Sequence, residues 1–150
     1  MHEHPYRRLA AMAALSFIAM YVLMYAMVDS LRNVYPNINQ FYMAALMTAP
    51  MVAIELVVMR AMYPRRAVNA VVAMLAVIAL IAFFALIRFQ SAVSDKEFLK
   101  SMIPHHAGAI LMCERASIRD AEISALCKEI VAGQQREIDQ MKRKLEMLRG

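Results

Sequence analysis

Two adjacent imidazoles are the clearest candidates for chemistry in this sequence. His105 and His106 stand in the segment from Phe98 to Cys113, where Met102 precedes them and Met112 follows them. Imidazole nitrogen together with thioether sulfur suits copper, above all the cuprous ion, better than it suits hard cations. These residue types therefore predict a soft-metal site. They also fit a helix interface in which the histidines are only packed and hydrogen-bonded.

The spacing of these donors is helical. Adjacent residues lie about 100° apart around a helix, so the two histidines can flank a seam between helices. One face carries Met102, His106, Ala109 and Cys113, and the neighbouring face carries Phe98, Met102, His105, Ala109 and Met112. Pro104 has no N–H to donate to the Lys100 carbonyl, so we expect a kink just before the histidine pair.

Two helices are expected to position these donors. Ser94 and Glu97 have the spacing of a capping box, which predicts a helix from Asp95 to Ala116. After a turn at Ser117–Arg119, Asp120 can cap a second helix that runs to Leu148. The segment 91–150 is thus predicted to be an antiparallel helical hairpin. Because two helices bury little apolar surface, we expect a homodimer or higher oligomer forming a four-helix bundle, or docking onto the membrane helices.

Cys113 and Cys127 are the only cysteines. An even count in an oxidising compartment favours a disulfide, which would stabilise the hairpin by about 3 kcal/mol. Reduced thiols or metal thiolates are the alternatives. If position 113 faces position 127, His106 faces Gln134, a candidate to orient the imidazole from the second shell. Glu137 and Met141 are the further candidates on the second helix.

Three apolar runs precede this segment, and 61% of the chain is hydrophobic. Runs of ~18 or more apolar residues are long enough to cross a ~30 Å hydrocarbon layer. We therefore expect residues 1–90 to form a lipid-embedded anchor with transmembrane helices at about 9–28, 41–62 and 67–87. The first run exceeds the apolar region of a cleaved signal peptide, so we expect it to be retained.

Charge placement predicts the topology. Arg7 and Arg8 precede the first run, and three arginines fill the loop near position 65. The positive-inside rule therefore places the N-terminus in the cytoplasm and residues after Arg88 outside it. We expect a bacterial inner (plasma) membrane, with the C-terminal domain periplasmic or extracellular. Charges of both signs are interleaved in that domain, so we expect no nucleic-acid partner.

Weaker candidates lie elsewhere. His2 and His4 could bind a metal, although chain termini are usually frayed. Methionine stripes in the first two spans could relay soft metal ions, but methionine is also ordinary packing material. Glu55 lies near the cytoplasmic end of its span, where pairing with Arg60, Arg65 or Arg66 is the expected role.

Three patterns are shared with a known family: F-L-x-x-M-I-P-H-H-x-x-A-I-x-M-C, D-x-E-I-x-x-L-C-x-x-I and Q-x-x-E-I-x-x-M. Over Asp95–Leu148 the chain resembles domain-of-unknown-function family 305. The membrane spans are expected to lie outside the resemblance. Members are similar to ferritin-like four-helix bundles, and some are periplasmic copper-binding proteins that use histidine and methionine.

The resemblance implies a ligand set in this chain, namely Met102, His105, His106, Met112 and Met141. Longer members hold a fuller bundle, so we expect a complete site to need a second subunit. The implied function is a membrane-anchored binding protein that sequesters copper or passes it to or from a donor or acceptor protein. No organic cofactor and no enzymatic reaction are expected.

Two alternatives remain open. The first is a non-catalytic assembly subunit whose histidines are merely packed. The second is a ferritin-like di-metal oxidoreductase, which would need E-x-x-H pairs. Neither histidine has a carboxylate three residues before it, since Met102 and Ile103 stand there.

Overall fold

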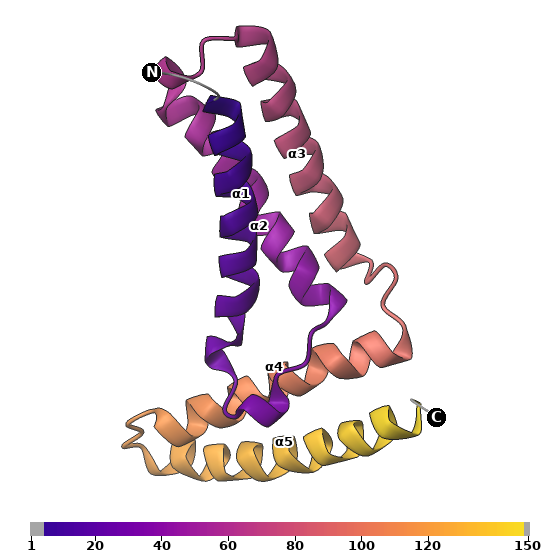
Figure 1. Ribbon diagram of the computed structural model, residues 1–150. Coiled ribbons are helices and arrows are strands. Elements are labelled where there is room, and N and C mark those ends of the chain that lie inside the picture. The colour runs from indigo at the N-terminus through magenta and orange to yellow at the C-terminus, as the bar shows by residue number, and fades with distance from the viewer. Residues whose placement is uncertain (1–4, 149–150) are drawn as a thin grey trace. The chain divides into compact units, whose positions relative to one another are not determined.

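The computed structural model describes residues 5–148, and every regular element in that range is helical (Figure 1). The α-helices are α1 (Pro5–Leu23), α2 (Ile38–Val58), α3 (Arg66–Arg88), α4 (Asp95–Arg115) and α5 (Ala121–Met147). Short 3-10 helices occupy Met24–Met27, Leu31–Asn33 and Arg60–Met62. The all-helical class expected from the sequence is confirmed. His2 and His4 lie outside the described residues.

The chain divides into two compact units. The membrane unit comprises residues 5–23 and 39–91, and the site unit comprises residues 24–38 and 92–148. The connection between α1 and α2 therefore belongs with α4 and α5 rather than with the helices that it joins.

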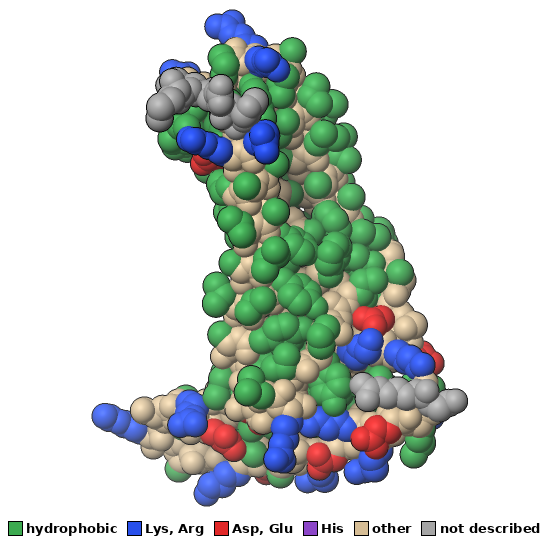
Figure 2. Space-filling model, viewed as in Figure 1, with side chains coloured by type: hydrophobic (Ala, Val, Ile, Leu, Met, Phe, Trp, Pro, Cys, Tyr) green, Lys and Arg blue, Asp and Glu red, His purple; other side chains and the backbone are tan. Residues whose placement is uncertain are grey.

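The membrane unit contains three helices long and apolar enough to cross a bilayer: Pro5–Met27, Ile38–Val58 and Arg66–Arg88. Large apolar side chains cover its surface, as the green areas of Figure 2 show. Val57 is 73% exposed and Ile81 is 63% exposed, as expected of side chains that face lipid. The second helix ends at Val58, four residues before the expected end of the span, because a 3-10 turn follows it.

Polar groups near one end of the membrane unit are paired with each other. Tyr6 Oη donates to Asn69 Oδ1 (2.9 Å), and Asn69 Nδ2 donates to the Tyr63 carbonyl (2.9 Å). Tyr63 Oη donates to Glu55 Oε1 (3.3 Å). The partner of Glu55 is thus a phenol. The expected ion pair with a neighbouring arginine is not formed among the described residues.

Both helices of the site unit begin where the sequence predicts. Ser94 Oγ accepts a hydrogen bond from the Glu97 N–H, and Asp120 Oδ1 accepts one from the Ile123 N–H. Each cap satisfies a backbone donor that has no partner inside the first helical turn. The α-helical ends at Arg115 and Met147 lie one residue before the predicted ends.

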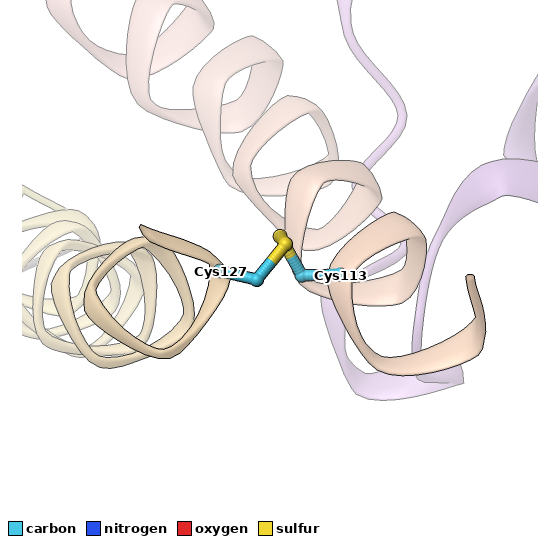
Figure 3. The surroundings of a disulfide bond; sticks show 2 residues. All are labelled: Cys113 and Cys127. Atoms are coloured by element: carbon cyan, nitrogen blue, oxygen red, sulfur yellow. A yellow bond between two sulfur atoms is a disulfide. The ribbon is translucent and has the colours of Figure 1, made fainter. Parts of the chain in front are cut away.

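The core of the site unit lies where α4, α5 and the 24–38 segment meet. Ile103 of α4 and Ile138 of α5 are both fully buried. Val28 and Tyr35 of the 24–38 segment pack against the same core. The helices lie side by side (Figure 1), and a disulfide between Cys113 and Cys127 joins them near their connection (Figure 3). The disulfide predicted from the sequence is confirmed.

Candidate metal site

The 24–38 segment holds α4 at the backbone position that Pro104 disrupts. Pro104 cannot donate to the Lys100 carbonyl, and Asn37 Nδ2 lies 3.5 Å from that oxygen. Ser101 Oγ in turn donates to Asn37 Oδ1 (3.2 Å). Asn37 is only 6% exposed, so these hydrogen bonds are shielded from water. A side chain from the connection between α1 and α2 therefore takes the place of a lost helical donor.

A second contact joins the start of α2 to α4. The Ile38 N–H donates to Glu97 Oε2 (2.9 Å), and Lys100 Nζ donates to Glu97 Oε1 (2.8 Å). A carboxylate at a helix N-terminus also interacts favourably with the helix dipole. Burial raises the pKa of Glu97, but the hydrogen bonds from Lys100 and Ile38 and the Lys100 charge outweigh that effect. The net pKa of Glu97 lies below its usual value.

His106 is the buried member of the histidine pair, at 9% exposure. Its Nδ1 lies 2.9 Å from the Met102 carbonyl, and its Nε2 lies 2.7 Å from Glu137 Oε2 on α5. A carbonyl oxygen can only accept, so Nδ1 carries a hydrogen. A backbone carbonyl bound to one imidazole nitrogen is a common way to orient a metal-binding histidine.

The other nitrogen of His106 faces an acceptor. In a neutral imidazole with its hydrogen on Nδ1, Nε2 has a lone pair, and the Glu137 carboxylate also offers lone pairs. A separation of 2.7 Å is a hydrogen-bond distance, so a proton lies between the two atoms. α4 and α5 each supply one potential metal ligand, and the two atoms would have to move apart for a metal ion to bind both.

His105 lies at a different place on the surface of α4. Its side chain is exposed, and its ring centroid is 6.2 Å from that of His106, with the ring planes at 63°. Met112, also expected to be a ligand, is 54% exposed. Met102 lies one turn before His106 on α4, and Met141 lies one turn after Glu137 on α5. Met141 packs against the hydrophobic core.

The structure bonds the His106 imidazole to Glu137, three residues farther along α5 than Gln134, the residue expected to face it. The role expected for Gln134 stays a prediction. Glu137 had been identified as a candidate on the second helix, and its contact with His106 is now defined.

No group of three or more His, Cys, Asp or Glu side chains within residues 5–148 could hold a metal ion. Within the described residues His106 and Glu137 form a two-residue pair, and Met102 and Met141 lie one helical turn from its members. A carboxylate-rich centre of the di-metal oxidoreductase type has no counterpart in the part of the chain that the structure describes.

The role of the 24–38 segment is not visible in the sequence. Pro104 indicates that the Lys100 carbonyl lacks a helical donor, but no pattern indicates that Asn37 approaches it. An asparagine just before α2 looks like an ordinary turn residue, and nothing local links it to a position 63 residues away.

The family model described as "Domain of unknown function (DUF305)" matches residues 43–145. The chain belongs to this family. The match extends through α2 and α3, so the expectation that the spans lie outside the resemblance is wrong for the second and third of them. The chain is also 30% identical over 133 residues to "Uncharacterized protein L153" of Acanthamoeba polyphaga mimivirus, covering 87% of this chain and 86% of that protein. No solved structure matches the chain.

Proposed function

We propose that this DUF305 protein is a membrane-anchored binding protein for copper, taken as the cuprous ion, which it sequesters or transfers outside the cytoplasm. The observation that carries the proposal is the His106 imidazole. Its Nδ1–H is fixed by the Met102 carbonyl, and its Nε2 is directed at the Glu137 carboxylate. A buried imidazole that is oriented through its Nδ1–H, with Nε2 as the candidate ligand, is a common way for a protein to present histidine to a metal.

The neighbouring donors fit a soft ion. Thioethers lie one helical turn from each member of the pair, Met102 next to His106 and Met141 next to Glu137. Imidazole with thioether favours copper over magnesium or calcium, which take oxygen ligands. The carboxylate is the hard donor of the set, and it must release Nε2 of His106 if that nitrogen is to bind the ion.

The arrangement of the site unit supports the proposed topology. If all three apolar helices cross the membrane, residues 24–38 and 92–148 must lie on the same side of it. These two segments pack together in one unit, with Asn37 and Ile38 bonded to α4. The arginine-rich loop between α2 and α3 then faces the cytoplasm, as the positive-inside rule requires.

Copper binding by the full chain in detergent tests the proposal. The parent should compete with a chromophoric cuprous chelator, and the His105→Ala/His106→Ala variant should lose at least about tenfold in affinity. Circular dichroism and the intact disulfide report whether the variant is folded. The His2→Ala/His4→Ala variant removes two imidazoles from the other end of the chain and should bind like the parent. Equal affinity in all three proteins would refute the proposal.

A non-catalytic assembly subunit is the second candidate. The observation in its favour is that both ring nitrogens of His106 have partners within the chain. In that case His106→Ala lowers the stability of the α4–α5 pair. The parent then takes no cuprous ion from the chromophoric chelator.

A further inference from the structure

The disulfide that joins α4 to α5 lines a cavity. Cys113 lies near the end of α4 and Cys127 near the start of α5, and their side chains meet between the two helices (Figure 3). The cavity has a volume of about 460 Å³ and opens to solvent, and both cysteines line it together with Glu114 and Lys128. Both cysteines are also only half-buried. A reagent that enters the cavity therefore reaches the sulfur atoms.

The hydrophobic core of the site unit does not extend to this end of the helix pair. The buried core residues lie within Ile103–Ile110 of α4 and Ile138–Leu145 of α5. Residues 111–130 are all described, and none of them is buried. The disulfide thus joins the two helices at a place where no side chain is buried between them. Opening the bond would release this end of the pair without removing a core contact.

The surroundings of a disulfide decide how easily it is opened. A disulfide is reduced when a thiolate attacks one of its two sulfur atoms, so the rate depends on access to sulfur. Exposed disulfides are the labile ones, whereas well-packed structural disulfides resist reduction. The open cavity and the lack of buried residues around it place the bond between α4 and α5 among the accessible ones.

The charges beside the two sulfur atoms differ in sign. Lys128 follows Cys127, whereas Glu114 follows Cys113, and both charged side chains line the cavity. Cys113 also lies in the last turn of α4, where the helix dipole is negative. A neighbouring positive charge stabilises a thiolate, and a better-stabilised thiolate leaves faster. Cys127 is therefore the better leaving group, which directs attack to Sγ of Cys113.

We propose that the Cys113–Cys127 disulfide is a thiol–disulfide exchange site that a partner dithiol opens from the cavity. A thiolate of the partner attacks Sγ of Cys113, the S–S bond breaks, and Cys127 leaves as a thiolate that takes up a proton. The second thiol of the partner loses its proton and attacks the partner's own sulfur in the mixed disulfide, and Cys113 leaves and is protonated. The chain gains two electrons and two protons, and the partner dithiol is oxidised to a disulfide.

The exchange acts as a switch on one end of the helix pair. In the oxidised chain the disulfide ties residues 111–130 together across the cavity. In the reduced chain this segment loses its covalent link, while the core of the pair stays in place. The inference goes beyond the proposed copper function and does not depend on it, since none of its tests contains a metal.

Reduction of the full chain in detergent tests access to the bond. The folded parent is incubated with increasing concentrations of dithiothreitol, and the thiols that appear are trapped with N-ethylmaleimide and counted by mass spectrometry. The rate should rise in proportion to the dithiothreitol concentration, because the attack occurs on the folded chain. A rate that reaches a plateau would mean that unfolding must come first, and it would overturn the proposal.

The monothiol glutathione identifies the sulfur atom that is attacked. Cys113 and Cys127 lie on different tryptic peptides, 101–115 and 120–128, so mass spectrometry distinguishes them. In mixed disulfides trapped at early times, glutathione should be on Cys113 and maleimide on Cys127, in an excess of at least about threefold over the reverse. Equal labelling, or an excess of the reverse, would overturn the assigned direction of attack.

The role of the neighbouring charge is tested with a matched pair of variants. Lys128→Gln removes the positive charge beside the leaving sulfur and should slow reduction by dithiothreitol about two- to fivefold. Lys144→Gln removes the same charge at an exposed position of α5 outside the cavity and should leave the rate unchanged. Equal slowing in both variants would show that Lys128 has no specific part in the exchange.

Hydrogen exchange tests the switch itself. In the reduced parent the amides of residues 111–130 should exchange at least about tenfold faster than in the oxidised parent. The acceleration should be smaller around Ile103 and Ile138, where the core holds the helices together. An acceleration of equal size throughout α4 and α5 would show that the bond supports the whole site unit, and it would overturn the local switch.

Discussion

The two units of this chain use apolar side chains in opposite ways. In the membrane unit many large apolar residues lie outside, as with Ile81 at 63% exposure, and no large side chain is fully buried. In the site unit Ile103 and Ile138 are fully buried between the helices, charges lie on the surface, and fewer large apolar residues are exposed. The difference follows from the surrounding medium, because lipid gives no hydrophobic drive for burial and water does.

Polar side chains follow the same division. In the membrane unit Asn69 and Glu55 find partners in Tyr6 and Tyr63, which keeps hydrogen-bonding groups from facing hydrocarbon. In the site unit polar contacts likewise join segments distant in sequence, such as Asn37 to Lys100, but there they position the helix that carries the histidine pair. The comparison shows that hydrophobic packing and specific polar contacts set the geometry of the site unit together.

The largest effect is expected from shortening a buried side chain of the site unit, compared with the same change at an exposed position of the membrane unit. Ile138→Ala removes a fully buried side chain and should lower the free energy of unfolding of the site unit by about 2–5 kcal/mol. Ile81→Ala, the same change on the exposed surface of α3, should alter stability by less than about 1 kcal/mol. Hydrogen exchange of α4 and α5 amides in detergent measures the first, and thermal unfolding of the whole chain measures the second. Equal effects would remove the contrast between the units.

Loss of the disulfide should affect one unit alone. The bond joins residues 14 apart, and opening such a loop should destabilise the site unit by about 3 kcal/mol. Amide exchange in α4 and α5 should accelerate in the Cys113→Ser/Cys127→Ser variant, while exchange in α3 stays unchanged. Comparable acceleration in all three helices would show that the units unfold together.

Asn37→Ala should destabilise the site unit by about 1–3 kcal/mol, because the part-buried Lys100 carbonyl loses its contact with the Asn37 amide. Pro104→Ala restores an N–H to α4 at the position that would normally serve this carbonyl. In the Pro104→Ala background the Asn37→Ala change should therefore cost less, and the difference measures their coupling. Additive costs in the double variant would mean that Asn37 does not replace the missing helical donor.

The smallest expected effect concerns Glu97, whose pKa is lowered in the folded chain. A lowered pKa means that the folded state favours the ionised carboxylate. Its contribution is complete above the ordinary glutamate pKa of about 4.3 and is lost as the pH falls toward the folded value. Glu97→Gln should flatten this acid limb of the stability profile of the site unit, with a change below about 1 kcal/mol at neutral pH. An unchanged pH profile would contradict the assignment.

The sequence determined much of this protein by itself. It predicted three apolar helices whose length matches the thickness of a membrane. It also predicted the capped helix starts at Ser94 and Asp120 and the pairing of the two cysteines. These features depend on local spacing and on side-chain chemistry, both of which can be read directly from a sequence. The histidine pair could also be singled out by residue type, since imidazoles next to methionines on one helix are uncommon.

Only the tertiary structure decided which imidazole is buried and what it meets. His106 rather than His105 turns toward α5 and bonds Glu137, because the relative rotation and crossing of two helices are not given by spacing along either of them. The structure also brought Asn37 and Ile38 onto α4. Contacts between segments some 60 residues apart are chosen by the packing of the whole unit, and no local pattern encodes that choice.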